Sequence, residues 1–266
     1  MSKIGFIGCG KMARAIIKGI IKTNFISPEN VLASKSSTNN LEETSKQLGI
    51  KITLDNKEVV KFADIIFLAV KPNQIEKVLK EIKDLITPQK LIVSVAAGIK
   101  TKFIENVLPA KTKVIRVMPN TPVLVNEGMI GVCAGAEANN KDVEQVVTIF
   151  SSIGKTVIVD EAQMDIVTAI SGSGPAFFYK VMNDIARAGE KLGMDYEKSL
   201  LLSIQTALGS AKMALNREIS MEELISNVAT KGGCTRVGTD ILETNKTDDI
   251  FYEVIKSTAE KARALG

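Results

Sequence analysis

Three small residues near the start of the chain have the spacing of a dinucleotide-binding turn. Gly8, Gly10 and Ala13 follow the apolar run 4–7, and a helical pattern begins directly after them. Glycine at the first position permits a tight turn, glycine at the second lets the backbone approach a pyrophosphate, and a small third residue allows close packing of helix on strand. A glycine turn without a ligand is the alternative. The position between strand and helix favours cofactor binding.

The residues that follow the second apolar run, 31–33, indicate which dinucleotide is bound. An acidic side chain about 20 residues after the glycines usually accepts hydrogen bonds from the ribose of NAD. This chain has Ser34, Lys35, Ser36 and Ser37 there instead. Hydroxyls and a lysine suit a 2′-phosphate, so we expect NADPH in preference to NADH, which stays possible. An ordinary polar turn would have the same composition.

Three further loops are expected at the edge of the sheet where a cofactor lies, after the carboxyl ends of parallel strands. Small residues in these loops would let the backbone approach a ligand, although tight packing favours them too. Lys71 is a candidate cofactor-binding residue only because of its expected position beside the cofactor, since an isolated lysine is usually a solvated side chain. The loops are Ala69-Val70-Lys71-Pro72, Ala96-Ala97-Gly98 and Met118-Pro119-Asn120-Thr121-Pro122.

Composition narrows the function classes. The chain has 266 residues, 45% of them hydrophobic, which is enough for one large or two ordinary domains. Its 34 basic and 30 acidic residues are interspersed, without the basic stripe that nucleic-acid binding needs. Histidine is absent, so histidine-dependent dehydrogenases and typical zinc enzymes are excluded, and we expect no metal.

The cysteines and the apolar runs predict a cytoplasmic protein. Cys9, Cys133 and Cys234 are odd in number and lack metal-ligand spacing, which is typical of reduced thiols. No cleavage pattern follows the first apolar run, so we expect no signal peptide. No run approaches the roughly 18 apolar residues of a membrane span.

Periodicity predicts an α/β fold of two domains. Helical patterns such as 40–48 and 73–85 separate apolar, β-branched runs, as in a Rossmann-type doubly wound, mostly parallel sheet. After about residue 160 long helical patterns take over, at 176–192, 196–216 and 249–265. We therefore expect a Rossmann domain at 1–159 and an all-helical domain at 160–266. The strand runs are residues 4–7, 31–33, 52–53, 65–70, 91–95, 114–118, 129–133 and 156–159.

Further motifs in the second half give the chain a family resemblance. Ser171-Gly172-Ser173-Gly174-Pro175-Ala176 precedes a long helical pattern, and Gly232-Gly233-Cys234-Thr235 follows later. Together with the glycine turn, Ala-Val-Lys-Pro and Met-Pro-Asn-Thr-Pro, in this order and at this spacing, they resemble the pyrroline-5-carboxylate reductase family. The resemblance runs from about residue 3 to residue 260.

The resemblance implies an activity and a cofactor site. In this family a hydride passes from NADPH to the C=N carbon of 1-pyrroline-5-carboxylate and gives L-proline, the last step of proline biosynthesis. Such a reduction needs a positioned donor and a proton but no strong side-chain base, which suits a chain without histidine. The positions implied to bind the cofactor are Ile7, Gly8, Cys9, Gly10, Lys11, Met12, Ser34, Asn56, Val70, Lys71 and Ala97.

The resemblance also implies a substrate site and an assembly. The matching substrate-binding residues are Glu161, Asn227, Gly233, Cys234 and Thr235. Thr235 would hydrogen-bond the ring nitrogen as the catalytic residue, and the amides of 233–235 would hold the carboxylate. Family members are homodimers with interlocked helical domains, often in larger rings, so each active site would draw on two chains.

Both glycine-rich motifs of the second domain also have plain structural explanations. Thr235 could cap the next helix, and Ser171 to Pro175 could be a serine cap with proline in the first helical turn. Cys234 is expected to be a small packing residue. The proton donor stays open between water, Thr235 and the protonated imine.

One departure from the family pattern bears on the substrate. Thr230-Lys231 replaces the usual Ser-Pro before the glycine pair, and Arg236 follows Thr235. Two extra cations beside a carboxylate site could tighten anion binding or indicate a related imine. A reductase of a six-membered cyclic imino acid is therefore one alternative. A catalytically silent NADP-binding regulatory protein is another, because the fold alone does not imply an activity.

Overall fold

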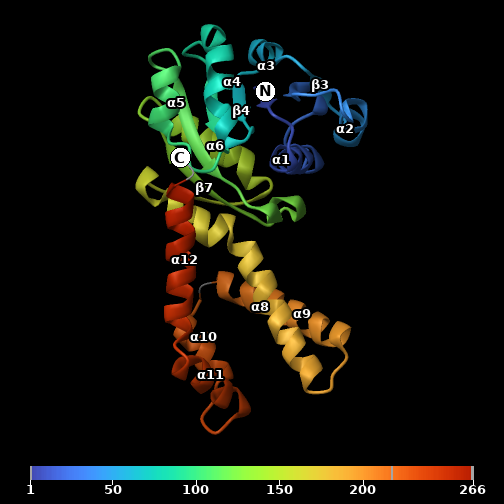
Figure 1. Cartoon of the computed structure of the whole chain (residues 1–266), viewed down its shortest axis with the longest axis vertical. Helices are drawn as coiled ribbons and strands as arrows, with labels where there is room; N and C mark the ends of the chain where they lie inside the picture. Colours follow the sequence, from blue (N-terminus) through green and yellow to red (C-terminus); the bar gives the residue numbers. More distant parts are fainter. Residues whose placement is uncertain (1, 217, 265–266) are drawn as a thin grey trace. The chain divides into compact units, whose positions relative to one another are not determined.

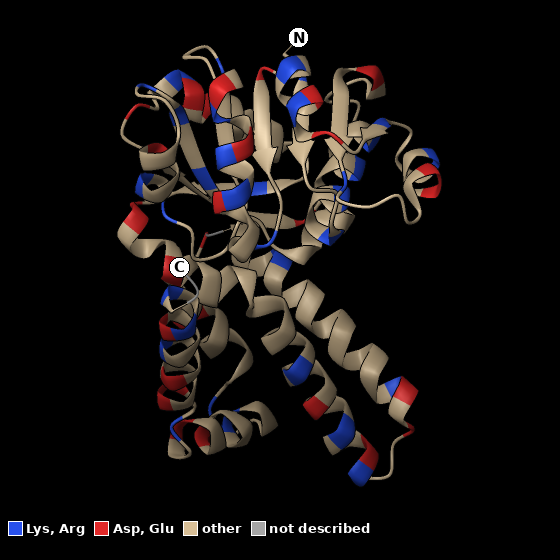
Figure 2. Ribbon diagram, turned by 45° about the horizontal axis from the view of Figure 1, so that its top comes forward, with Lys and Arg blue, Asp and Glu red and all other residues tan. Residues whose placement is uncertain are grey.

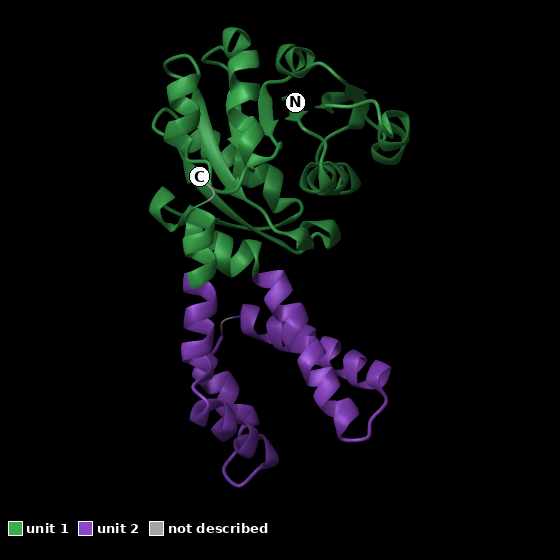
Figure 3. Cartoon of the chain, viewed as in Figure 1, with its two compact units in different colours: residues 1–173, 257–266 green, residues 174–256 purple. Residues whose placement is uncertain are grey.

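The computed structural model of the chain describes residues 2–216 and 218–264. They form two compact units (Figure 3). Unit 1 contains the described residues up to Ser173 and those from Ser257 onward, and unit 2 runs from Gly174 to Lys256. The division by packing therefore lies later than the boundary expected after residue 159.

The sheet of unit 1 has the strand order that creates a ligand crevice. Among the described residues its order is β3-β2-β1-β4-β5-β6-β7-β8, and only the β6–β7 pair is antiparallel (Figure 1). The order reverses at β1, so the carboxyl ends of β1 and β4 lie at a topological switch point. The strands are β1 (Ile4–Ile7), β2 (Val31–Ser34), β3 (Lys51–Thr53), β4 (Ile65–Leu68), β5 (Leu91–Ser94), β6 (Lys113–Met118), β7 (Gly128–Ala134) and β8 (Gly154–Ile158).

Helices cover both faces of this sheet. Helices α1 and α6 contribute to the apolar core on one face, and α3, α4 and α5 to the core on the other. All four residues of β1, β2, β4 and β5 are buried for this reason. The predicted doubly wound sheet is thus confirmed. The helices of unit 1 are α1 (Lys11–Lys22), α2 (Leu41–Leu48), α3 (Asn56–Phe62), α4 (Ile75–Ile82), α5 (Thr101–Val107), α6 (Asn140–Ser151) and α7 (Met164–Val167).

Short helical turns connect several of these elements. Two of them lie close to predicted site residues, since η2 begins after the loop 69–71 that follows β4, and η5 begins at Glu161 shortly after β8. The turns are η1 (Pro28–Asn30), η2 (Pro72–Gln74), η3 (Lys83–Leu85), η4 (Thr121–Val125), η5 (Glu161–Gln163) and the π-helical η6 (Thr168–Gly172).

The segment between β8 and unit 2 packs on the sheet, which explains where the two units divide. Met164 of α7 is fully buried with Met118 and Cys133. Asn120 donates a hydrogen bond to the carbonyl oxygen of Ser171 (3.2 Å). These contacts belong to unit 1, so residues 160–173 stay with the sheet although their pattern is helical.

Unit 2 is helical, as predicted, and leaves apolar side chains uncovered. Helices α8 and α9 form an antiparallel pair, joined by a hydrogen bond from the Ser203 hydroxyl to the Met182 carbonyl (3.0 Å). Phe178, Leu201 and Ile241 are more than half exposed. Apolar helix faces of this kind mark a protein interface. The helices are α8 (Gly174–Lys191), α9 (Tyr196–Asn216), α10 (Met221–Val228), α11 (Cys234–Thr244) and α12 (Thr247–Arg263), which ends in unit 1.

Figure 2 shows Lys and Arg interspersed with Asp and Glu in both units, as the composition predicts. Among the described residues no helix combines the length and apolar character of a membrane span. No group of three or more Cys, Asp or Glu side chains in the described part is arranged to hold a metal ion.

The aromatic cluster of the core gives a stability prediction. Phe67 is fully buried, stacks on Phe6 with ring centroids 4.6 Å apart, and meets the edge of Phe150 at 6.0 Å. We expect Phe67→Ala to lower the free energy of unfolding by about 3–5 kcal/mol, because it removes these contacts and leaves a cavity. Urea unfolding followed by circular dichroism measures this. Phe103→Ala is the control, since Phe103 is 39% exposed, and an equal effect of both changes would contradict the prediction.

Candidate active site

The glycine turn joins β1 to α1 and leaves room for a ligand. Gly8 has φ of +96°, and a Cβ atom there would lie 2.7 Å from the carbonyl oxygen of Ala69. Gly10 is the N-cap of α1, and no atom lies within 4 Å of the position its Cβ would take. The first amides of α1 have no side-chain cap and lack intrahelical partners, and the backbone at Gly10 is open to a close approach, which suits a pyrophosphate. Ala13 is buried, as close packing of helix on strand requires.

A cavity of about 450 Å³ lies in front of this turn. Nine of the predicted cofactor residues line it, and Leu54, Ser36, Gln74, Lys77, Val78 and Glu81 line it as well. The predicted residues are Gly8, Cys9, Gly10, Ser34, Lys35, Asn56, Ala69, Val70 and Lys71. Six predicted residues are outside its lining: Ile7, Lys11, Met12, Pro72, Ala97 and Asn120.

The sequence contained a signal for the missed residues of α4. Gln74, Lys77, Val78 and Glu81 recur at intervals of three or four residues, so they share one face of the helix that follows β4. Val78 is one of the buried apolar residues of α4, whereas Gln74, Lys77 and Glu81 are polar, so this polar stripe borders the apolar face and can line the cavity.

Ser34 holds the turn in place. Its hydroxyl accepts a hydrogen bond from the amide of Gly8 (3.3 Å) and donates to Oδ1 of Asn56 (2.7 Å). The Nδ2 atom of Asn56 in turn donates to Oε2 of Glu81 (2.9 Å). Ser34 is buried, so this hydroxyl fixes both the glycine turn and Asn56.

Lys35 is tied to its own loop. Its ammonium donates to the carbonyl oxygen of Asn39 (2.7 Å) and to the hydroxyl of Thr44 (3.3 Å). A lysine ammonium has three donors, so one stays available for an anion in the cavity. Lys71 and Lys77 line the same cavity and add positive charge beside it.

Cys9 and Asn120, two of the predicted cofactor residues, are both buried. Burial raises the pKa of the Cys9 thiol, although the charges of Arg14 and Lys35 act in the opposite direction. Asn120 is buried, accepts a hydrogen bond from the amide of Met129 (2.9 Å) and donates to Ser171. Asn120 therefore connects the end of β6 to the start of β7 and to η6.

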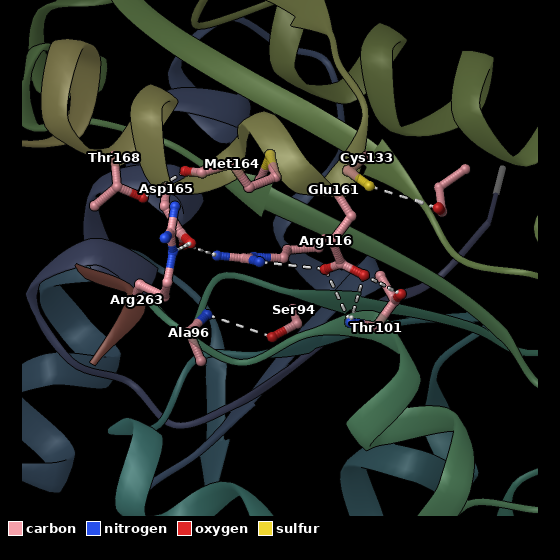
Figure 4. A network of polar contacts seen from close by, with 11 residues as sticks. Ser94, Ala96, Thr101, Arg116, Cys133, Glu161, Met164, Asp165, Thr168 and Arg263 are labelled. Atoms are coloured by element: carbon pink, nitrogen blue, oxygen red, sulfur yellow. Dashed lines mark hydrogen bonds and ion pairs between the residues drawn. The ribbon is translucent and has the colours of Figure 1, made fainter. Parts of the chain in front are cut away.

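The carboxylate of Glu161 is held by a buried network in unit 1 (Figure 4). Its oxygens accept hydrogen bonds from the Thr101 amide (3.0 Å) and hydroxyl (2.6 Å), and Oε1 lies 3.2 Å from Nη1 of Arg116. The Arg116 side chain is 1% exposed, and its Nη2 lies 3.5 Å from Asp165. Arg263 of α12 reaches the other oxygen of Asp165 at 3.6 Å.

This network affects the thiol beside it. Burial, and next the negative charge of Glu161, raise the pKa of Cys133 to about 11. The thiol therefore stays protonated at neutral pH, and it donates weakly to the carbonyl of Ala134 (3.5 Å).

The other predicted substrate residues lie in unit 2, near the start of α11. Gly233 is the N-cap, with Cys234 and Thr235 as the first two helical residues. Thr235 therefore does not cap the helix, and the explanation of this threonine as a plain cap is wrong. The amides at 233–235 begin a helix whose first N–H groups lack intrahelical partners, which suits a carboxylate. Asn227 is an exposed residue of α10.

The structure bears on the expectations that Lys231 and Arg236 add positive charge to the carboxylate site and that Cys234 is a packing residue. The guanidinium of Arg236 turns along α11, with Nε 2.7 Å from Asp240, so its charge is already paired. Lys231 and Cys234 are exposed in this chain. In the motif at residues 171–176, Pro175 is the second residue of α8 and therefore lies in the first helical turn, as predicted.

The doubly wound sheet and its glycine turn define a dinucleotide-binding protein. Residues 161–265 match the family model of pyrroline-5-carboxylate reductase dimerisation. Residues 3–98 match the model described as NADP oxidoreductase, coenzyme F420-dependent.

Relatives match over nearly the whole chain. A pyrroline-5-carboxylate reductase of Methanosarcina acetivorans is 39% identical over 264 residues, 99% of this chain and 98% of the relative. Pyrroline-5-carboxylate reductase 1 of Bacillus subtilis is 35% identical, over 99% of this chain and 89% of the relative.

Two solved structures are similar to this chain in both fold and sequence. The pyrroline-5-carboxylate reductase of Coxiella burnetii has a TM-score of 0.93 and 34% identity, covering 100% of this chain and 98% of its own. The Plasmodium falciparum pyrroline carboxylate reductase with NADP bound has a TM-score of 0.89 and 35% identity, with the same coverage. The chain belongs to the pyrroline-5-carboxylate reductase family, so the predicted resemblance is confirmed.

The Arg116 network gives a second prediction. Arg116→Met removes the cation and leaves the carboxylates of Glu161 and Asp165 without it, which should lower the free energy of unfolding by about 3–5 kcal/mol. Urea unfolding followed by circular dichroism is the measurement. Arg187→Met serves as the control, because it breaks an exposed pair with Glu190 and should change the midpoint little. Equal midpoints for the two variants would contradict a stabilising role of Arg116.

Proposed function

We propose that this chain catalyses the NADPH-dependent reduction of 1-pyrroline-5-carboxylate to L-proline, the last step of proline biosynthesis. The observation that carries the proposal is the 39% identity, over nearly the full length of both chains, to a protein named for this activity. The cavity in front of the glycine turn, in a family with an NADP-bound member, supports the cofactor.

The cofactor would lie along the carboxyl edge of the sheet. The amides at Gly8 to Met12 would hold the pyrophosphate, and Ser36 with the free donor of Lys35 would meet the 2′-phosphate at the end of β2. Ser34 and Asn120 would act indirectly, since their polar atoms already hold the chain. When bound, NADPH supplies a hydride.

Unit 2 would provide the groups that hold the imino acid. The amides at the start of α11 would bind the substrate carboxylate, and the Thr235 hydroxyl would hydrogen-bond the ring nitrogen. Asn227 and Cys234 would complete this side of the site. Orientation of an already electrophilic protonated imine then supplies much of the catalysis.

Glu161 would hold Thr101 and Arg116 in position and would contact the substrate through one remaining lone pair. Both of its oxygens already accept hydrogen bonds from Thr101, and one also lies beside Arg116. With 27% of its side chain exposed, it can still present one lone pair to a substrate N–H group.

The active enzyme would be a homodimer with interlocked helical domains, and such dimers would assemble into a larger ring. The exposed apolar faces of α8, α9 and α11 support an interface, as does the match of residues 161–265 to the family's dimerisation model. Three free cysteines among the described residues support a cytoplasmic location.

The direct test is the loss of NADPH absorbance when 1-pyrroline-5-carboxylate is added to the purified protein. We expect rapid oxidation with this five-membered ring and slower oxidation with the six-membered analogue. Oxidation with the analogue alone would overturn the substrate assignment and direct attention to Lys231. If neither compound causes NADPH oxidation, the result would favour the catalytically silent NADP-binding protein.

A substitution tests the role of Thr235. Thr235→Ala should lower kcat/KM for the imine by about tenfold to a hundredfold, the size expected for one lost hydrogen bond to a charged group. Binding of NADPH should stay nearly unchanged, and Thr235→Ser should restore turnover. Thr239→Ala is the matched control, because this hydroxyl lies one turn further along α11 and donates to the carbonyl of Arg236. Parallel loss of NADPH binding and turnover would contradict a substrate role.

A further inference from the structure

The cavity in front of the glycine turn has a part that the phosphates and the ribose leave free. Its lining begins at Gly8 and Gly10, where a pyrophosphate fits, and continues at the end of β2, where the adenosine ribose fits. The remaining wall comes from two segments that follow β3 and β4, and its residues are Leu54, Asn56, Gln74, Lys77, Val78 and Glu81. A base attached to that ribose must enter this part of the cavity.

The walls of this part suit a flat heteroaromatic ring. Leu54 and Val78 contribute apolar surface from different segments of the lining. Leu54 is 51% exposed, so its side chain is accessible to a ring bound in the cavity. Asn56 and Glu81 provide the polar surface, and they are hydrogen-bonded to each other at 2.9 Å.

Hydrogen bonds fix the orientation of the Asn56 amide. The Ser34 hydroxyl accepts from Gly8, so its own proton goes to Oδ1 of Asn56. This places Nδ2 toward the acceptor-only carboxylate of Glu81. One N–H of the amide remains unused by these bonds, beside a carboxylate oxygen that can still accept.

A donor beside an acceptor is the complement of one edge of adenine. Adenine presents an acceptor at N7 and a donor at its exocyclic amino group, whereas guanine has the acceptor O6 in place of that amino group. The same holds for hypoxanthine, whose O6 would meet the carboxylate of Glu81 acceptor to acceptor. The pair therefore matches adenine and opposes a 6-oxopurine.

We propose that Glu81, held by Asn56, reads the purine base of the cofactor and selects adenine. The inference rests on the proposed cofactor site and adds a specificity-determining residue to it. Glu81 accepts from the exocyclic amino group, and the spare N–H of Asn56 donates to N7. Ser34 thus links the phosphate end of the groove to its base end through one chain of hydrogen bonds.

The test compares two ligands that differ only at the base. Isothermal titration calorimetry gives the dissociation constants of NADP⁺ and of its hypoxanthine analogue, nicotinamide hypoxanthine dinucleotide phosphate, without turnover. The unsubstituted protein should bind NADP⁺ more tightly by about tenfold or more, because the analogue keeps N7 but sets O6 against the carboxylate of Glu81, so one hydrogen bond is replaced by an unpaired acceptor. In Glu81→Gln the ratio should fall to about threefold or less, because an amide can donate to O6.

A neighbouring carboxylate of the same helix provides the matched control. Glu76 pairs with Lys80 at 2.6 Å and is outside the cavity lining. Glu76→Gln should therefore leave the ratio of the two dissociation constants unchanged. A fall of the same size in this variant would overturn the proposal, since it would reflect the charge of the helix and not a contact with the base.

Other outcomes separate this inference from the cofactor assignment. Equal ratios in the unsubstituted protein and in Glu81→Gln, with tight NADP⁺ binding in both, would overturn the role of Glu81 and leave the cofactor site intact. A change in the ratio of NADP⁺ to NAD⁺ binding alone would place Glu81 at the ribose, which also overturns it. Failure of the unsubstituted protein to bind NADP⁺ would overturn both the site and the inference.

Discussion

The buried guanidinium of Arg116 is the constraint on which much of unit 1 depends. A cation that is 1% exposed is tolerated only where carboxylates compensate its lost hydration. Here β6 supplies the cation, and η5 and α7 supply Glu161 and Asp165. Because Asp165 also meets Arg263, the segment that leaves unit 1 and the helix that returns to it are both fixed to the sheet. The same network fixes the carboxylate of Glu161.

A second set of contacts organises the cofactor groove. The tight turn at Gly8 brings its amide to Ser34, and Ser34 orients Asn56. Ser34, which the sequence predicts as a cofactor ligand, thus has its hydroxyl engaged in hydrogen bonds inside the protein. Preorganisation of this kind lowers the entropy lost on binding, since the polar atoms of the groove are already in place.

The fold could be predicted largely from local pattern. Strands buried on both faces are continuous apolar runs, so β1, β4 and β5 were visible in the sequence. The point at which the two units divide could not be predicted in this way, because residues 160–173 are helical in pattern yet pack on the sheet through Met164 and Asp165. Partners far apart in sequence also decide the surroundings of Asn120, which bonds to Met129 and Ser171. No local pattern reports such contacts.

The sequence by itself determined the doubly wound sheet, the glycine turn and the family, because these depend on residue types at fixed spacing along the chain. The tertiary structure alone decided that Ser34 bonds to Asn56, that Glu161 is held by Arg116 and Thr101, and that Glu81 lies beside Asn56. The physical reason is that hydrogen bonds and ion pairs are short-range. Which polar atoms meet is therefore set by how distant segments pack, which spacing along the chain does not specify.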